Sequence, residues 1–290
     1  MINIQNSPIE NISFNNFNFL IKRDDLLHID FSGNKARKFQ YFLDNDFPNI
    51  STVISYGSNQ SNAMYSLSVL CKLKNWNFIY YTNHIPSFIK INPIGNYKYA
   101  LENNMKIIEG EYDKLNIKYD SNNTLFVKEG GAIKQSAYGI KILANEIQEY
   151  ILKNNLHDIK IFLPSGTGTT ALYLQKNLNC DVLTCACVGN DEYLKKQFFE
   201  LDKNSENHPI ILKTVKKFHF GKLYKENYNL YKELLSQTKI QFDLLYDPIG
   251  LNTLFYHQDN IDINNILYIH QGGIKGNETM IERYSRKYEI

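Results

Sequence analysis

The sequence lacks an excess of either charge and lacks a long apolar run. Its 290 residues carry 32 lysines and arginines against 30 aspartates and glutamates, so the formal net charge is only +2. Such a balance argues against nucleic acid and anionic membrane surfaces as partners. No run of about 18 apolar residues occurs, and no basic stretch followed by an apolar one opens the chain. We therefore predict a cytoplasmic protein that acts on a small molecule, with no nucleic acid and no membrane as partner.

Cysteine is also scarce, since the chain holds only four. Cys185 and Cys187 have the spacing at which two side chains share one face of a strand. No histidine or further cysteine pair supplies the rest of a metal site, so we interpret them as buried structural residues and expect no metal. Internal repeats and linkers rich in proline or serine are missing as well. A second domain is therefore expected as an insertion rather than as a tail.

Short β-branched or aromatic runs alternate with longer segments whose apolar residues recur at helical spacing. The runs predict strands at residues 17–22, 52–56, 77–82, 105–109, 124–128, 159–163, 181–188, 242–246 and 266–270. The longer segments predict helices at residues 34–44, 60–74, 89–103, 137–155, 169–178, 191–201, 225–237 and 277–288. This alternation is typical of an α/β protein with parallel sheets.

Polar segments that contain glycine or asparagine follow four of these strands, at residues 55–62, 129–136, 164–170 and 270–277. In parallel sheets the carboxyl ends of the strands and the starts of the following helices converge at one edge, where free backbone amides can bind a ligand. We therefore expect the binding site to be built from these loops.

The segment PSGTGTTA, which follows the predicted strand at residues 159–163, has the composition of an anion site. Gly166 and Gly168 allow the backbone to approach a ligand, and Thr167, Thr169 and Thr170 add hydroxyl donors suited to a phosphate monoester. Two alternatives stay open. The glycine spacing also fits a loose dinucleotide fingerprint, and a plain strand-to-helix turn favours glycine and threonine for geometric reasons.

The segment SYGSNQSNAM places five polar side chains in a row, at residues 58–62, where a strand is expected to turn into a helix. Capping of the helix start explains one or two of them, because serine and asparagine accept hydrogen bonds from the free amides of the first turn. A donor array of this density is better suited to a carboxylate or phenolate oxygen. We therefore favour ligand binding over capping alone.

In FSGNKARKF, residues 31–39, one lysine stands two residues after a glycine and at a predicted helix start. Most lysines in such a place are solvated surface charges, and Arg37 and Lys38 behind Lys35 fit that interpretation. The positive end of a helix nevertheless disfavours an ammonium group, which lowers the pKa of Lys35 toward that of an imine-forming amine. Together with a phosphate loop and an anion loop, Lys35 predicts a pyridoxal phosphate site.

The sequence resembles the family of 1-aminocyclopropane-1-carboxylate deaminases and D-cysteine desulfhydrases, which are pyridoxal-phosphate enzymes of the tryptophan-synthase-β type, also called fold type II. The matching segments occur in family order and span nearly the whole chain. They are KRDDLLHIDFSGNKARKFQY at 22–41, SYGSNQSNAM at 55–64, EGGAIKQSAYGI at 129–140, LPSGTGTTALYL at 163–174, FHFGKLY at 218–224, YDPIGLNTL at 246–254 and IHQGGIKGNETMIER at 269–283.

The resemblance implies two open α/β domains with largely parallel twisted sheets, and pyridoxal 5'-phosphate in the cleft between them. The large cofactor domain would comprise residues 1–44 and 136–290, and a small inserted α/β domain would comprise residues 45–135. Because dimers are common in the family, a homodimer is expected.

The resemblance also implies a role for the residues of these motifs. Lys35 would hold the cofactor as an imine and move protons at the substrate, with Ser61 as a second catalytic residue. Asn62 would bond the 3-oxygen of the pyridine ring. The cofactor phosphate would be held by Gly166, Thr167, Gly168, Thr169 and Thr170. The substrate carboxylate would be received by Asn59, Gln60 and Ser61.

The chain departs from the family pattern around the pyridine ring. Family members usually carry tyrosine where this chain has Gly250, and the cyclopropane deaminases follow it with glutamate where this chain has Leu251. The tyrosine is implicated in ring opening, and the glutamate pairs with the pyridine nitrogen. Tyr224 and Tyr246 are candidates to reach the vacated space at the substrate. Gln271, which replaces the usual threonine, would be a neutral partner for the nitrogen and would give a weaker electron sink.

We therefore expect a pyridoxal-phosphate-dependent lyase or deaminase that acts on a small amino acid. The favoured reaction is the α,β-elimination of a D-cysteine desulfhydrase, which yields pyruvate and ammonia, because a leaving group at Cβ drains the carbanion even when the sink is weak. Three alternatives stay open: 1-aminocyclopropane-1-carboxylate deamination, a degenerate member that binds cofactor or amino acid without turnover, and, more distantly, a nicotinamide-dependent oxidoreductase.

Overall fold

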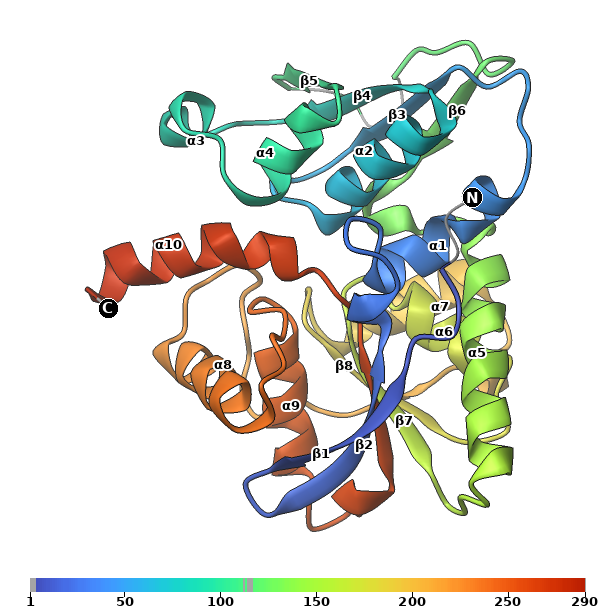
Figure 1. Cartoon of the computed structure of the whole chain (residues 1–290), viewed down its shortest axis with the longest axis vertical. Helices are drawn as coiled ribbons and strands as arrows, with labels where there is room; N and C mark the ends of the chain where they lie inside the picture. The colour runs from blue at the N-terminus through green and yellow to red at the C-terminus, as the bar shows by residue number, and fades with distance from the viewer. Residues whose placement is uncertain (1–3, 112, 114–116, 290) are drawn as a thin grey trace.

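The strands form two separate sheets, one in the lower and one in the upper part of Figure 1. The computed structural model describes residues 4–111, 113 and 117–289. The larger sheet has the order β1-β2-β10-β7-β8-β9 and the smaller one the order β5-β4-β3-β6. Among the described strands, only β1 and β2 pair in antiparallel fashion, and the other pairs are parallel. The predicted parallel α/β fold is therefore confirmed.

The elements have the following bounds. The strands are β1 Ile9–Phe14, β2 Phe17–Arg23, β3 Thr52–Tyr56, β4 Asn77–Thr82, β5 Met105–Glu109, β6 Thr124–Val127, β7 Lys160–Ser165, β8 Val182–Ala186, β9 Ile210–Ile211 and β10 Ile266–His270. The α-helices are α1 Gly33–Asp44, α2 Asn62–Lys74, α3 Ser87–Ile91, α4 Gly95–Glu102, α5 Ser136–Lys153, α6 Thr169–Gln175, α7 Asp191–Leu201, α8 Lys225–Thr238, α9 Asp247–Tyr256 and α10 Asn277–Tyr288. Within the described residues, no helix has both the length and the apolar content that crossing a bilayer would require.

The strand predicted at residues 242–246 is wrong, and a helix follows that the sequence did not predict. The Asp243 carboxylate accepts hydrogen bonds from the backbone amides of Leu245 and Tyr246, at 2.8 and 2.7 Å, which turns the chain into α9. Pro248 suits the first turn of this helix, because its missing amide would have no partner there. The helix predicted at residues 89–103 is two helices, since Pro93 separates α3 from α4.

All four strands of the smaller sheet lie within residues 45–135, the segment proposed as an inserted domain. The domain boundaries themselves stay a prediction. Cys185 and Cys187 are both buried in the core of the larger sheet, beside Phe162 and Leu183, as expected for structural cysteines.

Four charged side chains beneath α1 form a buried ion-pair network. Arg37 contacts Asp24 at 2.9 Å and Glu146 of α5 at 2.7 Å, and Lys22 of β2 contacts the same Glu146 at 2.7 Å. Arg37 is 0% exposed, so the interpretation of a solvated basic face is wrong for this residue. Burial would lower the pKa of Arg37, but the two carboxylates raise it, so the guanidinium stays charged. The network fixes α1 against β2 and α5.

Gly33 opens α1 with a φ of +66° and touches the loop after β10. A Cβ atom at this position would lie 1.9 Å from the carbonyl oxygen of Gln271. That oxygen accepts a hydrogen bond from the Asn34 amide at 2.9 Å. Only glycine leaves room for this contact, which joins the start of α1 to the end of β10.

The variant Gly33→Ala is expected to lower the free energy of unfolding by roughly 2–5 kcal/mol, the sum of a left-handed backbone cost and overpacking. Gly221→Ala is the matched control, because Gly221 has a φ of +73° and nothing within 4 Å of an added Cβ. The control should lose only about 1–2 kcal/mol. Urea denaturation of both variants measures the difference, and equal losses would contradict a tight contact at Gly33.

Candidate active site

A cavity of about 40 Å³ lies where the starts of α1 and α2 meet the loop after β10. Lys35 lines it from α1, Asn62 from α2, and Gln271 and Lys275 from the loop after β10. Two of the four loops that the sequence singled out, at residues 55–62 and 270–277, thus contribute to one site. Because α2 flanks the smaller sheet and α1 and β10 belong to the larger one, both parts of the molecule form the wall.

Burial lowers the pKa of Lys35 to about 8, and the Asp243 carboxylate opposes this shift. The sequence argument expected the direction but gave the helix start as its cause, whereas desolvation is the larger effect. The Lys35 ammonium lies 3.3 Å from the side-chain oxygen of Asn34. A large fraction of Lys35 is therefore a neutral amine near pH 8, which is the form that attacks a carbonyl.

Lys38 lies one turn beyond Lys35 and is only 2% exposed, so the solvated-surface interpretation is wrong for this residue too. Its ammonium donates to the carbonyl of Gly130 at 3.0 Å and lies 3.5 Å from the Thr167 hydroxyl. Burial and the neighbouring Lys35 ammonium hold the pKa of Lys38 well below its usual value. The sequence analysis missed Lys38 because its burial depends on contacts with loops about 90 and 130 positions away.

The threonine loop at residues 166–170 lies beside Lys38 and does not line the cavity. Within it the hydroxyls of Thr167 and Thr169 are 3.0 Å apart. The Thr170 hydroxyl is buried and has no hydrogen-bond partner among the described residues. An unpaired buried hydroxyl costs free energy, so this loop is one donor short of satisfaction.

Asn62 is held from both sides within the cavity wall. Its side-chain oxygen accepts from Asn96 at 2.6 Å, and its amide donates to the Asp243 carboxylate. Asn96 comes from α4 beside the smaller sheet, and Asp243 comes from the larger part. The bond between Asn62 and Asp243 therefore ties the two parts together at the site.

The other polar residues of that segment are engaged elsewhere and do not line the cavity. Ser61 caps α2 by accepting from the amides of Ala63 and Met64. Asn59 donates to the carbonyl of His84 at 2.6 Å. Gln60 accepts from Thr279 and donates to the backbone of the chain before α4. The structure thus gives these three side chains capping and interface contacts, not a place at the cavity.

Asp243 is a buried carboxylate that the sequence analysis did not identify, because its segment was assigned to a strand. It forms a reciprocal cap with Asp247, whose carboxylate accepts from the Asp243 amide at 2.7 Å. Burial and the Asp247 carboxylate raise the pKa of Asp243 to about 7. Two aspartates four positions apart around a helix start, with proline next, were the available signal.

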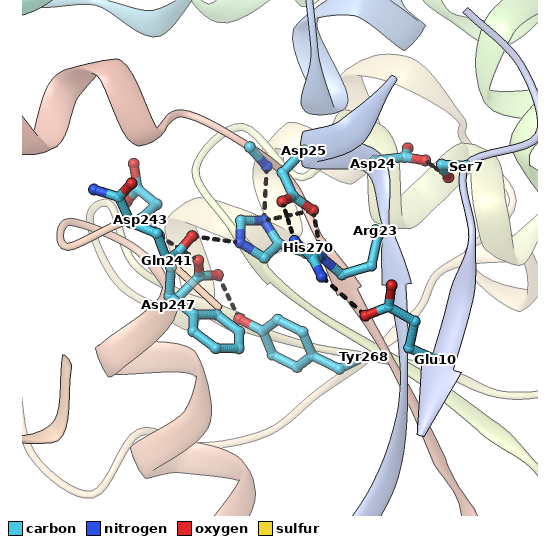
Figure 2. Close-up of polar contacts among 12 residues, drawn as sticks. Ser7, Glu10, Arg23, Asp24, Asp25, Gln241, Asp243, Asp247, Tyr268 and His270 are labelled. Carbon is cyan, nitrogen blue, oxygen red and sulfur yellow. Dashed lines mark hydrogen bonds and ion pairs between the residues drawn. The ribbon is translucent and has the colours of Figure 1, made fainter. Parts of the chain in front are cut away.

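The loop after β10 is shaped by His270, as Figure 2 shows. The His270 Nδ1 accepts from the Gly272 amide at 3.1 Å, and Nε2 donates to the Gln241 carbonyl at 2.9 Å. These two bonds together require the neutral ring with its proton on Nε2. Asp25 lies 3.8 Å from Nδ1 and is itself paired with Arg23 at 2.8 Å.

Gln271, predicted near the pyridine nitrogen, lines the cavity and links two elements. Its oxygen accepts from Asn34 at 2.9 Å, and its amide donates to the Pro164 carbonyl at 2.6 Å. The side chain thus connects α1 to the end of β7, which leads into the threonine loop.

The positions that depart from the family pattern do not line the cavity. A Cβ at Gly250 would lie 3.0 Å from the Pro164 ring, and Leu251 is fully buried in the core. Tyr224 packs on Phe218 and its hydroxyl accepts from the His219 amide, so the predicted substrate contact is not seen.

Tyr246 lies beside the threonine loop instead. A Cβ added at Gly166 would be 3.3 Å from its hydroxyl. Burial and the Asp243 carboxylate raise the pKa of Tyr246, so the hydroxyl keeps its proton. Of the two tyrosines that the sequence proposed, this one adjoins a predicted cofactor segment.

Comparison with known proteins gives matches among solved structures only, since no family model and no curated protein matches the chain. The crystal structure of an ACC deaminase homologue superposes with a TM-score of 0.80 over 98% of this chain and 94% of that one, at 19% identity. The chain shares its fold. A hydrogen sulfide-producing enzyme from Fusobacterium nucleatum (TM-score 0.64, 13% identity, 94% and 97% covered) and a fungal L-serine ammonia-lyase from Rhizomucor miehei (0.66, 13%, 99% and 99%) are similar as well.

The variant Asp243→Asn is expected to make Lys35 more acidic, because a nearby carboxylate favours the charged form of an amine. The pH midpoint for acetylation of Lys35 by acetic anhydride, followed by mass spectrometry, should lie near 8 in the parent protein. It should fall by about 1 pH unit in the variant. Asp181→Asn, which removes an exposed carboxylate paired with Lys160, should leave the midpoint unchanged. An unchanged or higher midpoint in Asp243→Asn would contradict the described charge pairing.

Proposed function

We propose that this protein binds pyridoxal 5'-phosphate at Lys35 and eliminates a β-substituent from a small amino acid. The resemblance of its motifs to the deaminase and desulfhydrase family and its fold likeness to an ACC deaminase homologue support this. The names of the other similar structures, a hydrogen sulfide-producing enzyme and an L-serine ammonia-lyase, agree with a lyase.

The observation that carries the proposal is an uncompensated positive charge beside the threonine loop. Lys35 and Lys38 are close enough to depress the pKa of Lys38, and no carboxylate of the described residues pairs with Lys38. A buried cation without a counter-charge is costly. A phosphate group at the threonine loop would supply that charge and accept a hydrogen bond from the unpaired Thr170 hydroxyl. The donor set therefore fits a phosphorylated aldehyde.

The space at the site requires that the two parts of the molecule separate on binding. The cavity of about 40 Å³ is smaller than ligand pockets of the usual size, which hold roughly 300–1,000 Å³. Polar contacts that cross between the parts include Asn62 with Asp243, Thr279 with Gln60 at 3.1 Å, and Tyr99 with Glu278 at 2.6 Å. Such hydrogen bonds exchange readily with water, so opening is a modest step.

When bound, pyridoxal phosphate acts as an electron sink that acidifies the α-hydrogen of an amino acid joined to its aldehyde carbon. Lys35 would hold the aldehyde, yield to the substrate amine, and then as a neutral amine remove the α-proton. Loss of the β-substituent follows, and addition of water gives the keto acid. For cysteine the balance is cysteine plus water to pyruvate, hydrogen sulfide and ammonia.

A D-cysteine-like substrate is proposed ahead of 1-aminocyclopropane-1-carboxylate. Gly250 packs on Pro164 and Leu251 is in the core, so neither position offers a tyrosine or a carboxylate to the cavity. Ring opening needs such groups, whereas elimination relies on the departing substituent. We propose in addition that the protein is a cytoplasmic homodimer.

The variant Lys35→Ala is expected to lose the visible absorbance that pyridoxal phosphate gives when joined to a lysine, together with all turnover. Absorbance spectra after loading and removal of free cofactor, and a keto-acid assay over D- and L-cysteine, D-serine, β-chloroalanine and 1-aminocyclopropane-1-carboxylate, measure both. Lys153→Ala, on the exposed side of α5, should behave like the parent. Retained absorbance in Lys35→Ala would refute the assignment, and a chromophore without keto acid would leave a binding protein.

Lys38→Met is expected to weaken selection for the cofactor phosphate. The parent should bind pyridoxal phosphate more tightly than pyridoxal, and the variant should lose roughly tenfold to a hundredfold of that preference, the range for a hydrogen-bonded charge. Titration of the apoprotein with both compounds, followed by the visible absorbance, gives the ratio. A ratio that does not change would place the phosphate elsewhere.

A further inference from the structure

The cavity requires a group that receives the substrate carboxylate, and the three residues that the resemblance suggests are engaged elsewhere. Asn59 donates to the His84 carbonyl, Gln60 is bonded to Thr279 and to the chain before α4, and Ser61 caps α2. None of them lines the cavity. The inference drawn here rests on the proposed function and concerns how its substrate is recognised.

Two cations line the cavity, Lys35 and Lys275. Lys35 has a covalent role in the proposed function. Lys275 has no carboxylate within ion-pair distance among the described residues, and its ammonium lies 4.5 Å from the centroid of the Tyr99 ring. A ring face holds an ammonium through its quadrupole without neutralising the charge. Lys275 therefore keeps a full positive charge available.

The acidic residues of the wall do not cancel this charge. Asp25 is paired with Arg23 at 2.8 Å, and Asp30 accepts a hydrogen bond from the Tyr65 hydroxyl at 3.1 Å. Glu278, three positions beyond Lys275, accepts from the Tyr99 hydroxyl at 2.6 Å. Tyr99 is thus fixed at its hydroxyl end while its face supports the lysine.

Lys275 stands across the cavity from Asn62 and Asn96. A Cβ on the adjoining Gly276 would lie 3.3 Å from the Asn96 amide and 3.4 Å from the Asn62 oxygen. Asn96 is 1% exposed and its side-chain oxygen has no partner among the described residues. A buried polar atom left unpaired in a cavity wall indicates that a polar ligand completes the wall.

We propose that Lys275 binds the α-carboxylate of the substrate, so that the site selects free amino acids over their uncharged amides. Its turn, Ile274–Gly276, directly follows the loop that carries Gln271. The ammonium thus approaches the cavity on the side opposite α2. Tyr99 limits the motion of the lysine stem and leaves the charge for the ligand.

The test uses the cofactor-loaded protein and two ligands without a leaving group, alanine and alaninamide, each as both enantiomers. Titration of the visible absorbance gives the two dissociation constants at one pH. The parent should prefer alanine. Lys275→Gln should lose roughly tenfold or more of that preference, while its cofactor absorbance stays intact. In turnover, its KM should rise far more than its kcat falls, and Lys275→Arg should restore part of the preference.

Lys98→Gln is the matched control, because the Lys98 ammonium lies 5.4 Å from the centroid of the same Tyr99 ring but does not line the cavity. It should keep the parental preference. An unchanged preference in Lys275→Gln, or equal weakening of alanine and alaninamide, would overturn the assignment and leave a structural role. A parent protein that shows no cofactor absorbance would overturn the proposed function itself, so the two failures are distinguishable.

Discussion

The structure depends on how one short helix buries positive charge. Within its first six residues α1 carries Lys35, Arg37 and Lys38, and all three turn inward. Arg37 is compensated by Asp24 and Glu146, so it anchors the helix. The two lysines on the same turns are not compensated in this way. Because the anchored helix cannot rotate them into water, their charges must be lowered or met by a ligand, and the site follows from that constraint.

Much of the fold follows from local pattern. The bounds of β3, β4, β5, β10, α7 and α10 agree with those expected, because each is a compact apolar run or an amphipathic segment with clear ends. The failures occur where a side chain overrides local preference. Asp243 captures two backbone amides in an apolar run that reads as a strand, and β9 has only two residues, too few for any periodicity.

The site was less predictable than the fold. Motif spacing located Lys35, Asn62 and Gln271, which do line the cavity. It did not show that α2 begins at Asn62, which turns the three preceding side chains to capping and interface contacts. Lys38, Asp243 and Lys275 matter because of neighbours far along the chain, and a single sequence gives no measure of such proximity.

The hydrogen bond from Asn34 to Gln271 joins residues 237 positions apart. A nascent chain therefore presents α1 long before the wall that completes the site has left the ribosome. Until β10 arrives, the lysine on α1 is an ordinary solvated amine, without the burial that makes it reactive. Capture of an aldehyde is in this way confined to the finished chain, and incomplete products of translation remain chemically inert.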